Sequence, residues 1–463
     1  MTTSNAQASI PDVPLDQSAE ASADSRRGFL RQTAGLAAIG ASSLGVASLA
    51  VHSEVSGQEN NSPWTIGFIG CGGMGGNHLR SLAGRRDVRL AALCDVDEQR
   101  LAASIKQVEN AGQKTPKAVK DLRQILDDPA IQAVFIATPD HWHAPAAILA
   151  ANAGKHVYVE KPCSHNLREG RMMIEAARRN KVVMQVGTQS RSTAHVQKAM
   201  QRLREGVIGD VLAAKAWNSQ KRGNIGKAQP SAPPPHLDYD LWLGPVPAIP
   251  YQTNFLHGIW RWWYAFGAGD IGNDGVHDID IAAWGLGVQT LPTRIAALGG
   301  KYFFDDDQQW PDTQYVAFEF STSDGAKRQL VFEQRIWSPY VQEGFENGDA
   351  YYGTNGMLIL GKSGGFKIYG PRNKLIDSFE GGSPDLVAHH NNFFDCIRTG
   401  AKPNADIEIN FLSTSLCHLA NIATRVGRVV NFDPTREVVI GDEEAHAMLG
   451  RTYREGHWAV PKS

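Results

Sequence analysis

The chain has 463 residues, of which 42% are hydrophobic and 20% charged, a composition typical of a globular protein with a large core. Its length suggests two domains, its net charge of −2 argues against a nucleic-acid partner, and no stretch is apolar enough for a membrane-spanning helix. The five cysteines are widely spaced, which predicts small buried side chains rather than a zinc site or a disulfide framework.

The N-terminal region has the composition of an export signal. Residues 1–24 are rich in Ser, Ala, Asp and Gln and are expected to be disordered. Paired arginines, Arg26 and Arg27, then precede Phe-Leu and a mildly apolar stretch over 33–50 that ends in small residues. This order is typical of a secretory signal, and the paired arginines resemble a twin-arginine (Tat) signal. The alternative is a frayed amphipathic helix.

If that signal is functional, residues 1–62 are a signal peptide and linker. We then expect a periplasmic or otherwise exported protein, the Tat export machinery as a partner, and no stable membrane span after processing. Export in the folded state suits a protein that loads a nucleotide in the cytoplasm.

A glycine-rich motif follows the first predicted strand, 64–69, and precedes a helix expected over about 76–82. In a G-x-G-x-x-G motif, the glycines permit a tight turn, a close approach of the backbone to a pyrophosphate, and close packing of helix on strand. The free amides at the helix N-terminus favour the phosphates. The residues expected to contact the cofactor here are Gly70, Gly72, Gly73, Met74 and Gly75.

Asp95 directly follows the second predicted strand, 88–94. It stands about 20 residues beyond the third glycine, where a dinucleotide-binding fold places the acid that accepts hydrogen bonds from the adenosine ribose. A carboxylate there would repel a 2′-phosphate, so NAD is expected in preference to NADP. The alternative is that Asp95 only caps a helix.

Strands and helices then alternate, which predicts an α/β domain with a doubly wound parallel sheet, a Rossmann domain, over 63–187. Helices are expected over 121–126, 143–153 and 168–180, and strands over 133–137, 157–159 and 182–186. Ligands of such sheets bind beyond the carboxyl ends of the strands. Gly70, Asp95, Thr138 and Lys161 all stand at such ends.

Several motifs together resemble the Gfo/Idh/MocA oxidoreductase family. They are the glycine motif, Ala137-Thr138-Pro139 with His143, Glu160-Lys161-Pro162, Gly267–Asp270 leading into Asn273–Asp280, and His390–Gly400. The resemblance covers about residues 64–430. It implies a second α/β domain, 188–463, with a large open, mostly antiparallel sheet that binds substrate and forms a homo-oligomer, a dimer or a tetramer. Strands readable at 294–298, 315–320, 329–334 and 356–360 agree with such a sheet.

Family members transfer hydride between nicotinamide and a hydroxyl or ketone carbon of a sugar or cyclitol. By this resemblance Lys161 is the acid/base, and a lysine near a cationic nicotinamide can have its pKa lowered toward neutrality. His277 would hydrogen-bond the reacting oxygen or share the proton. Thr138, Pro139, His143 and Glu160 would lie beside the cofactor. The alternatives are a surface lysine and a structural imidazole.

The sequence departs from the family at one position of the substrate site. Many relatives carry an Asp four residues before the His, where this chain has Asn273, and Asp274 stands three before it. An amide cannot act as the carboxylate of a proton relay. Either Asp274 takes that catalytic role through a different local turn, or no carboxylate is needed.

An aromatic segment, 260–264, precedes this motif and supplies further substrate candidates, Arg261 and Trp262, beside Lys161, Asn273 and His277. Core packing is the alternative for each Trp. The Pro-rich insert 220–251 is expected to form a loop wall over the site. His141 with His143, and His389 with His390, have no obvious third ligand, so no metal is predicted.

Three functions remain open from the sequence. The first is an exported NAD-dependent dehydrogenase that acts on a carbohydrate and retains its NAD. The second is an NAD-dependent glycoside hydrolase that uses transient sugar oxidation and elimination. The third, a nucleotide-binding scaffold, is disfavoured by the presence of both Lys161 and His277.

Overall fold

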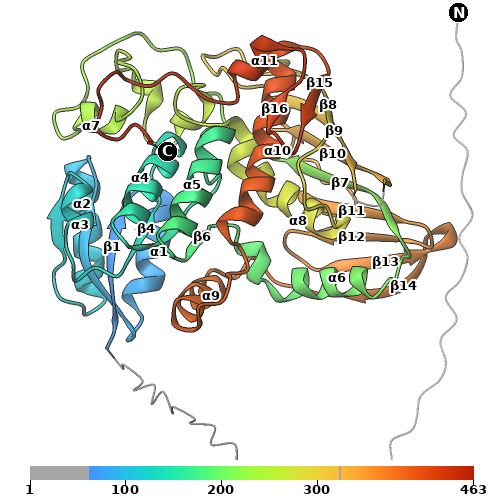
Figure 1. Cartoon of the computed structure of the whole chain (residues 1–463), viewed down its shortest axis with the longest axis horizontal. Coiled ribbons are helices and arrows are strands. Elements are labelled where there is room, and N and C mark those ends of the chain that lie inside the picture. Colours follow the sequence, from blue (N-terminus) through green and yellow to red (C-terminus); the bar gives the residue numbers. More distant parts are fainter. Residues whose placement is uncertain (1–61, 323–324, 463) are drawn as a thin grey trace, which may run out of the picture. The chain divides into compact units, whose positions relative to one another are not determined.

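A computed structural model of the chain describes residues 62–322 and 325–462. The predicted twin-arginine signal lies outside the described residues. The described part contains two sheets, one of six strands formed by the N-terminal half and one of ten strands formed by the C-terminal half (Figure 1). This arrangement confirms the predicted fold class.

The N-terminal sheet is parallel throughout, with strand order β3-β2-β1-β4-β5-β6. Its strands are β1 Trp64–Ile69, β2 Val88–Cys94, β3 Lys117–Val119, β4 Ala133–Ile136, β5 His156–Val159 and β6 Met184–Val186. The chain reverses its winding direction between β1 and β4, and ligands of open parallel sheets bind at such a switch point.

Five helices complete this half: α1 Gly73–Ala83, α2 Glu98–Asn110, α3 Arg123–Leu126, α4 Asp140–Asn152 and α5 Leu167–Arg179. Helix α1 begins at Gly73, inside the glycine motif and earlier than predicted. Glycine has low helix propensity, so the motif itself did not indicate a helix. Helix α4 also begins earlier, directly after Pro139. Its first turn is buried on all sides and therefore shows no helical apolar period.

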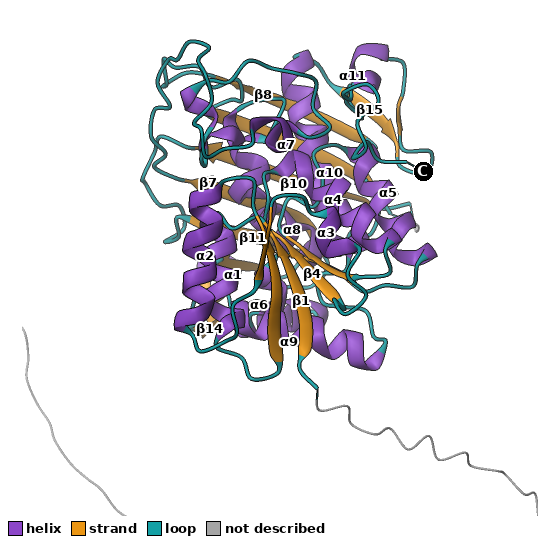
Figure 2. Ribbon diagram, turned by 90° about the vertical axis from the view of Figure 1, so that its left-hand side faces the viewer, coloured by secondary structure: helices purple, strands orange, loops and turns teal. Residues whose placement is uncertain are grey.

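The C-terminal sheet has strand order β14-β13-β12-β11-β7-β10-β9-β8-β15-β16 and is antiparallel except where β7 pairs with β10. Its strands are β7 Val211–Ser219, β8 Arg294–Gly300, β9 Thr313–Ser321, β10 Lys327–Arg335, β11 Asn347–Gly353, β12 Met357–Gly361, β13 Phe366–Gly370, β14 Lys374–Phe379, β15 Val430–Asp433 and β16 Val438–Val439. The associated helices are α6 Ala194–Arg204, α7 Tyr239–Leu243, α8 Val276–Leu286, α9 Leu386–Thr399, α10 Ile407–Val426 and α11 Glu443–Ala447. Helices α8 and α10 pack on the sheet, and Figure 2 shows the strands behind them.

Helix α9 belongs to the C-terminal half of the sequence but packs into the core of the N-terminal sheet. Its Phe393 and Phe394 are fully buried against Phe68, Phe135 and Tyr158. Burial of an aromatic side chain of this size contributes roughly 1.5–3 kcal/mol. The nucleotide half is therefore completed by residues more than 200 positions away from its last strand.

A buried ion pair fixes α8, the helix that carries His277. The Nε of Arg191, which follows β6, lies 2.7 Å from Oδ2 of Asp280 on α8, and Ser413 of α10 donates to the same carboxylate. Arg191 and Asp280 are both buried. Because removing one partner leaves an uncompensated buried charge, this pair ties the orientation of α8 to the N-terminal half.

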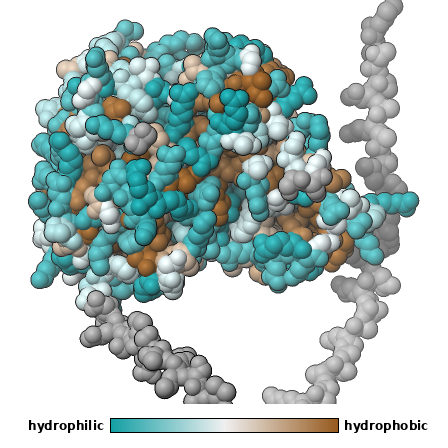
Figure 3. Space-filling view, viewed as in Figure 1, coloured by the Kyte–Doolittle hydropathy of each residue, from teal (hydrophilic) through white to brown (hydrophobic). Residues whose placement is uncertain are grey.

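All five cysteines are buried and free, as the spacing predicted. No helix in the described ranges combines the length and apolarity needed to cross a membrane. On the face drawn in Figure 3, polar and apolar residues are interspersed over both halves.

Candidate active site

A cavity of about 600 Å³ lies at the carboxyl ends of the N-terminal strands and is closed by residues of the C-terminal half. Thirteen of the predicted site residues line it: Gly70, Gly72, Gly73, Met74, Asp95, Thr138, Pro139, His143, Glu160, Lys161, Arg261, Asn273 and His277. Three predicted residues do not, namely Gly75, Asp274 and Trp262. The glycine motif and the lysine–histidine pair thus share one cavity.

The glycine motif forms a cradle that side chains would fill. Gly70 has φ +92°, and a Cβ added there would lie 2.7 Å from the carbonyl of Ala137, directly after the neighbouring strand β4. A Cβ added to Gly75 would lie 2.1 Å from the carbonyl oxygen of Gly70, so this glycine allows α1 to contact β1. The geometry fits a bound dinucleotide whose pyrophosphate meets the N-terminus of α1.

Asp95 connects the end of β2 to this cradle. Its Oδ2 accepts a hydrogen bond of 2.7 Å from the amide of Cys71, and its Oδ1 accepts one of 2.8 Å from the amide of Asp97. Burial raises the pKa of Asp95, and the two amide hydrogen bonds oppose that shift. Each carboxylate oxygen keeps a lone pair for a ribose hydroxyl, because one oxygen accepts about two hydrogen bonds.

We expect Asp95→Ser to raise the ratio of kcat/KM with NADP to kcat/KM with NAD by about tenfold or more. The substitution removes the repulsion between the carboxylate and a 2′-phosphate, which is about 1–4 kcal/mol at 4 Å separation. Steady-state kinetics with both nucleotides measures the ratio. Asp121→Ser is the matched control, since Asp121 also lines the cavity but is bound by Arg123. An equal change in both variants would contradict the assignment.

The turn after β4 presents a polar atom without a partner to the cavity. Thr138 Oγ1 is buried and makes no hydrogen bond within the described chain. The two ring nitrogens of His143 lie 2.8 Å from the carbonyl oxygen of Thr138 and 2.7 Å from that of Pro162. His143 therefore holds the turns after β4 and β5 together, and Thr138 is left available to a ligand.

Lys161 follows β5 and reaches across to the C-terminal half. Its Nζ donates to the carbonyl oxygen of Asn273. Burial lowers the pKa of Lys161 from its usual 10.5, opposed by the charge of Glu160 and reinforced by that of Arg261. The amine is therefore easier to deprotonate than an exposed lysine, as a general base requires.

Glu160 is anchored by a line of buried imidazoles. Its Oε1 lies 2.9 Å from Nε2 of His78 on α1, whose Nδ1 lies 2.9 Å from Nε2 of His390 on α9. Burial opposes ionisation of Glu160, but the hydrogen bond and charge of His78 lower its pKa to about 2. Glu160 is thus ionised and held in place by His78, and its charge acts on the adjacent Lys161. The sequence identified neither His78 nor the role of His390.

His277 stands in the first turn of α8, after a π-helical turn over Ile271–Gly275. Its Nδ1 is buried and has no hydrogen-bond partner among the described residues. Burial, with the positive charges of Lys362 and Lys161, lowers the pKa of His277 to about 3. The ring is therefore neutral near pH 7 and can exchange a hydrogen bond with a substrate hydroxyl.

Asp274 is engaged away from the cavity. Its Oδ1 lies 2.6 Å from Nζ of Lys362, and its Oδ2 accepts from Gln220 and from Arg222. Burial opposes its ionisation, but the charge and hydrogen bond of Lys362 hold the pKa of Asp274 well below its usual value. The catalytic role considered for Asp274 stays a prediction, and the geometry gives this carboxylate a part in positioning the turn before His277.

Arg261 and Trp262 occupy the C-terminal wall. Arg261 stacks on Trp260, with its guanidinium carbon 4.2 Å from the ring centroid, and Trp260 also lines the cavity. Trp262 instead lines an adjoining cavity of about 350 Å³, together with Arg222, Gly258, Arg261 and Asn273. The aromatic segment is therefore divided between the two spaces.

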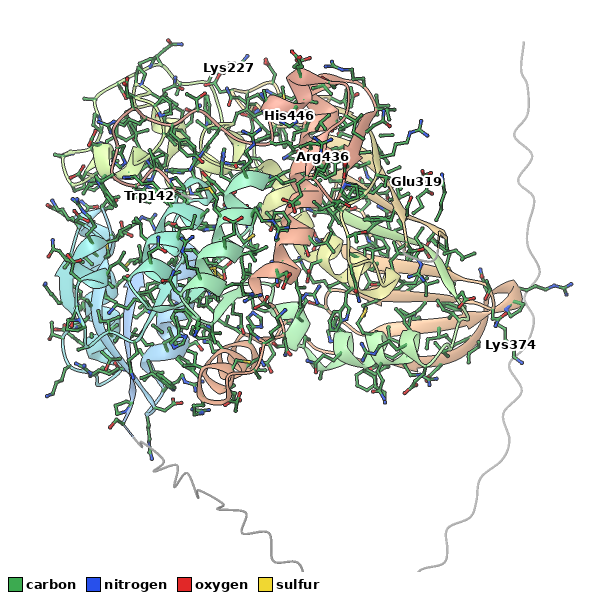
Figure 4. All side chains as sticks on the ribbon, viewed as in Figure 1. Trp142, Lys227, Glu319, Lys374, Arg436 and His446 are labelled. Carbon is green, nitrogen blue, oxygen red and sulfur yellow. The ribbon has the colours of Figure 1, made fainter. Side chains whose placement is uncertain are left out.

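The insert and the C-terminal tail cover the adenosine side, as the predicted loop wall requires. Leu237 bridges to Asp97, and Trp242 accepts a hydrogen bond of 2.9 Å from the indole of Trp142. Figure 4 shows Trp142 where α4 meets the insert. Sequence reasoning did not identify several residues that line this side of the cavity: Asp97, Arg100, Trp142, His257 and Trp458.

In residues 62–322 and 325–462, no group of three or more His, Cys, Asp or Glu side chains is placed to hold a metal ion. His141 contacts the carbonyl oxygen of Trp242, and His389 contacts that of Val186. Both imidazoles thus form hydrogen bonds with backbone carbonyl oxygens of neighbouring segments.

Comparisons with known proteins agree with this geometry. A family model described as an oxidoreductase family with an NAD-binding Rossmann fold matches residues 64–188. The model of the same family's C-terminal alpha/beta domain matches residues 207–460.

Curated relatives match shorter stretches. Levoglucosan dehydrogenase of Pseudarthrobacter phenanthrenivorans is 42% identical over 96 residues, 21% of this chain and 25% of the relative. Myo-inositol 2-dehydrogenase of Thermotoga maritima is 32% identical over 174 residues, 38% of this chain and 47% of the relative. A glycosyl hydrolase family 109 protein of Shewanella pealeana is 33% identical over 161 residues, 33% of this chain and 34% of the relative. The chain thus matches less than half the length of each.

Solved structures share the fold over most of the described chain. Levoglucosan dehydrogenase in complex with NADH and levoglucosan superposes with a TM-score of 0.61 at 19% identity, covering 80% of this chain and 99% of that one. An aldose-aldose oxidoreductase from Caulobacter crescentus superposes with a TM-score of 0.61 at 19% identity, covering 80% and 100%. With the cradle, Asp95 and the two family models in agreement, the chain belongs to the Gfo/Idh/MocA family of NAD-binding oxidoreductases.

Proposed function

We propose that the protein is an NAD-dependent oxidoreductase that acts on a hydroxyl or ketone carbon of a sugar, cyclitol or sugar derivative. The observation that carries this proposal is that Lys161 and His277 line the same cavity as the glycine cradle and Asp95. Bound NAD supplies the hydride acceptor or donor at the carbinol carbon. The chain supplies a cavity in which Lys161 and His277 can move a proton at the same time.

Lys161 and His277 suggest the path of the proton between the substrate and the protein. In oxidation, the substrate O–H proton passes to the amine of Lys161, whose pKa burial lowers. The neutral His277 orients the same oxygen through a hydrogen bond, and the fixed charge of Glu160 stabilises the ammonium that forms. In reduction the same proton returns from Lys161 to the new alkoxide oxygen.

The names of the relatives support a carbohydrate or cyclitol substrate and also favour a second candidate. Two are dehydrogenases of levoglucosan and myo-inositol, and several are named glycosyl hydrolase family 109 proteins. The second candidate is therefore an NAD-dependent glycoside hydrolase, in which the sugar is oxidised transiently and the cofactor is restored within each turnover.

One experiment separates the two candidates. The purified protein, loaded with NAD, is incubated with 4-nitrophenyl glycosides and with free sugars while nitrophenol release and nicotinamide absorbance are recorded. A sugar-dependent absorbance change without aglycone release supports the dehydrogenase. Aglycone release without net NADH supports the hydrolase. Neither signal across both sets would argue against a carbohydrate substrate.

We also propose export by the twin-arginine route to the periplasm and assembly into a homo-oligomer through the C-terminal sheet. The paired arginines support the first proposal, and exposed apolar side chains on the sheet strands, Leu212, Leu298, Tyr315 and Tyr352, support the second. Cell fractionation of the wild type and of an Arg26→Lys/Arg27→Lys variant tests export, because only the wild type should reach the periplasm. Sedimentation of the purified protein tests assembly, and a monomer would contradict it.

A further inference from the structure

Arg261 stands at the junction of the two cavities. It belongs to the short 3-10 turn Ile259–Trp262 and lines both the cavity of about 600 Å³ and the adjoining one of about 350 Å³. Gly258 and Asn273 are shared by both linings as well. A ligand that extends from Lys161 toward the smaller cavity can therefore meet the guanidinium group.

Within residues 62–322 and 325–462, this guanidinium donates hydrogen bonds to neutral groups only. Its Nε donates to Oδ1 of Asn273 at 2.8 Å, and its Nη1 donates to the carbonyl oxygen of Gly258 at 3.0 Å. Its Nη2 makes no hydrogen bond, and no carboxylate oxygen lies within 4.0 Å of its nitrogens, within residues 62–322 and 325–462. Burial lowers the pKa of Arg261, although the charges of Asp140 and Asp270 oppose the shift.

The other cations on this wall have carboxylate partners. Arg222 pairs with Asp270 at 3.1 Å and with Asp274 at 3.2 Å, and Lys362 pairs with Asp274 at 2.6 Å. Asp270 and Asp274 thus form ion pairs with other cations, whereas Arg261 forms no ion pair within 4.0 Å in the described part of the chain. A partly buried cation without a carboxylate in contact is costly, so its retention at a cavity wall points to a ligand that completes the pair.

Asn273 accounts for this leftover charge. Its Oδ1 accepts from Arg261, and its Nδ2 donates to Oδ1 of Asp270 at 2.9 Å. A carboxylate at position 273 would neutralise Arg261 and would also face Asp270 at close range. The amide holds the arginine in place without cancelling its charge. The departure from the family pattern at this position therefore has a physical consequence for the substrate.

We propose that the substrate is an acidic sugar, a uronic acid or its glycoside, whose carboxylate binds the Nη atoms of Arg261. This inference rests on the proposed function and names the substrate class of the same site. Arginine is suited to the task because its planar fork matches a carboxylate. Asn273 contacts both side chains, Lys161 through its backbone oxygen and Arg261 through its side-chain oxygen, and all three residues line the same cavity.

Binding to the NAD-loaded protein tests the inference independently of turnover. Isothermal titration compares glucuronate with glucose, and galacturonate with galactose, at low and high salt. We expect the acid of at least one pair to bind about 10- to 100-fold more tightly than its neutral parent, the range for a hydrogen bond to a charged group. Arg261→Met should reduce this preference by the same factor, and Arg261→Lys should restore part of it. Asn273→Asp should reduce the preference although Arg261 is present.

The binding results separate a failure of the acidic-sugar inference from a failure of the proposed oxidoreductase function. Equal binding of acid and neutral sugar, or a preference that survives Arg261→Met, overturns the inference. If neutral sugars alone are bound and oxidised, the inference fails and the oxidoreductase stands. If Arg261→Met weakens NAD retention and leaves the sugar preference intact, the guanidinium belongs to the pyrophosphate and the inference is overturned. If the loaded protein binds no sugar of either kind, the proposed carbohydrate function fails with it.

Discussion

Replacing Lys161 by methionine is expected to lower kcat by about 10²- to 10⁴-fold, the contribution of a positioned general acid or base. Methionine keeps most of the side-chain volume but cannot accept the hydroxyl proton. Retention of NAD should change little, because the cradle and Asp95 are untouched. The rate of sugar oxidation with the wild type should rise with pH as the amine deprotonates, at a pH below the usual lysine pKa of 10.5 because burial lowers the pKa of Lys161. The variant should lose this dependence.

Lys155 offers a matched control for this experiment. Lys155 precedes β5 as Lys161 follows it, is buried, and donates to the carbonyl oxygen of Asp128 without lining the cavity. Lys155→Met should affect stability and leave kcat within a few-fold of the wild type. Equal losses of kcat in both variants would show that the loss reflects damage to the strand rather than the chemistry of Lys161.

Gly75→Ala is expected to weaken NAD binding by about 10- to 100-fold. The new Cβ would lie 2.1 Å from the carbonyl oxygen of Gly70, so α1 must move away from β1 or the turn must open. Forcing an extra carbon into such a contact costs about 1–3 kcal/mol, and each 1.4 kcal/mol is tenfold in Kd. Calorimetric titration of nucleotide-free protein with NAD measures the change.

The adjacent glycine supplies the control. A Cβ on Gly76 meets nothing within 4 Å, and alanine is a better helix former than glycine. Gly76→Ala should therefore bind NAD as the wild type does, with equal or greater thermal stability. Unchanged NAD affinity in Gly75→Ala would contradict the assigned role of the cradle, provided that circular dichroism shows both variants folded.

The nucleotide half of the site was predictable because its determinants are local in sequence. The cradle, Asp95, Thr138 and Lys161 each follow a short apolar strand, and parallel strands bring such ends to one edge. The sequence missed α2, whose buried residues are only Leu101, Ser104 and Val108. Three such residues make a weak apolar stripe for a helix.

The substrate wall was less predictable because its contacts join distant residues. Asp274 meets Lys362, 88 residues away, and Gln220, 54 residues away, and no spacing in the sequence indicates such partners. The departure at Asn273 was visible in the sequence, but its meaning depends on Arg261, which only the folded turn places beside it. The His78–His390 contact likewise spans 312 positions.

We propose that one cavity holds NAD beside Lys161 and His277. The most direct test of this proposal is mass spectrometry of the nucleotide released when the purified protein is denatured, followed by calorimetric titration of the nucleotide-free protein. We expect NAD either to be released from the protein or to be taken up at one site per chain, with weaker binding in Gly75→Ala. A protein that neither carries NAD nor binds it on addition would show that this cavity is not a nucleotide site.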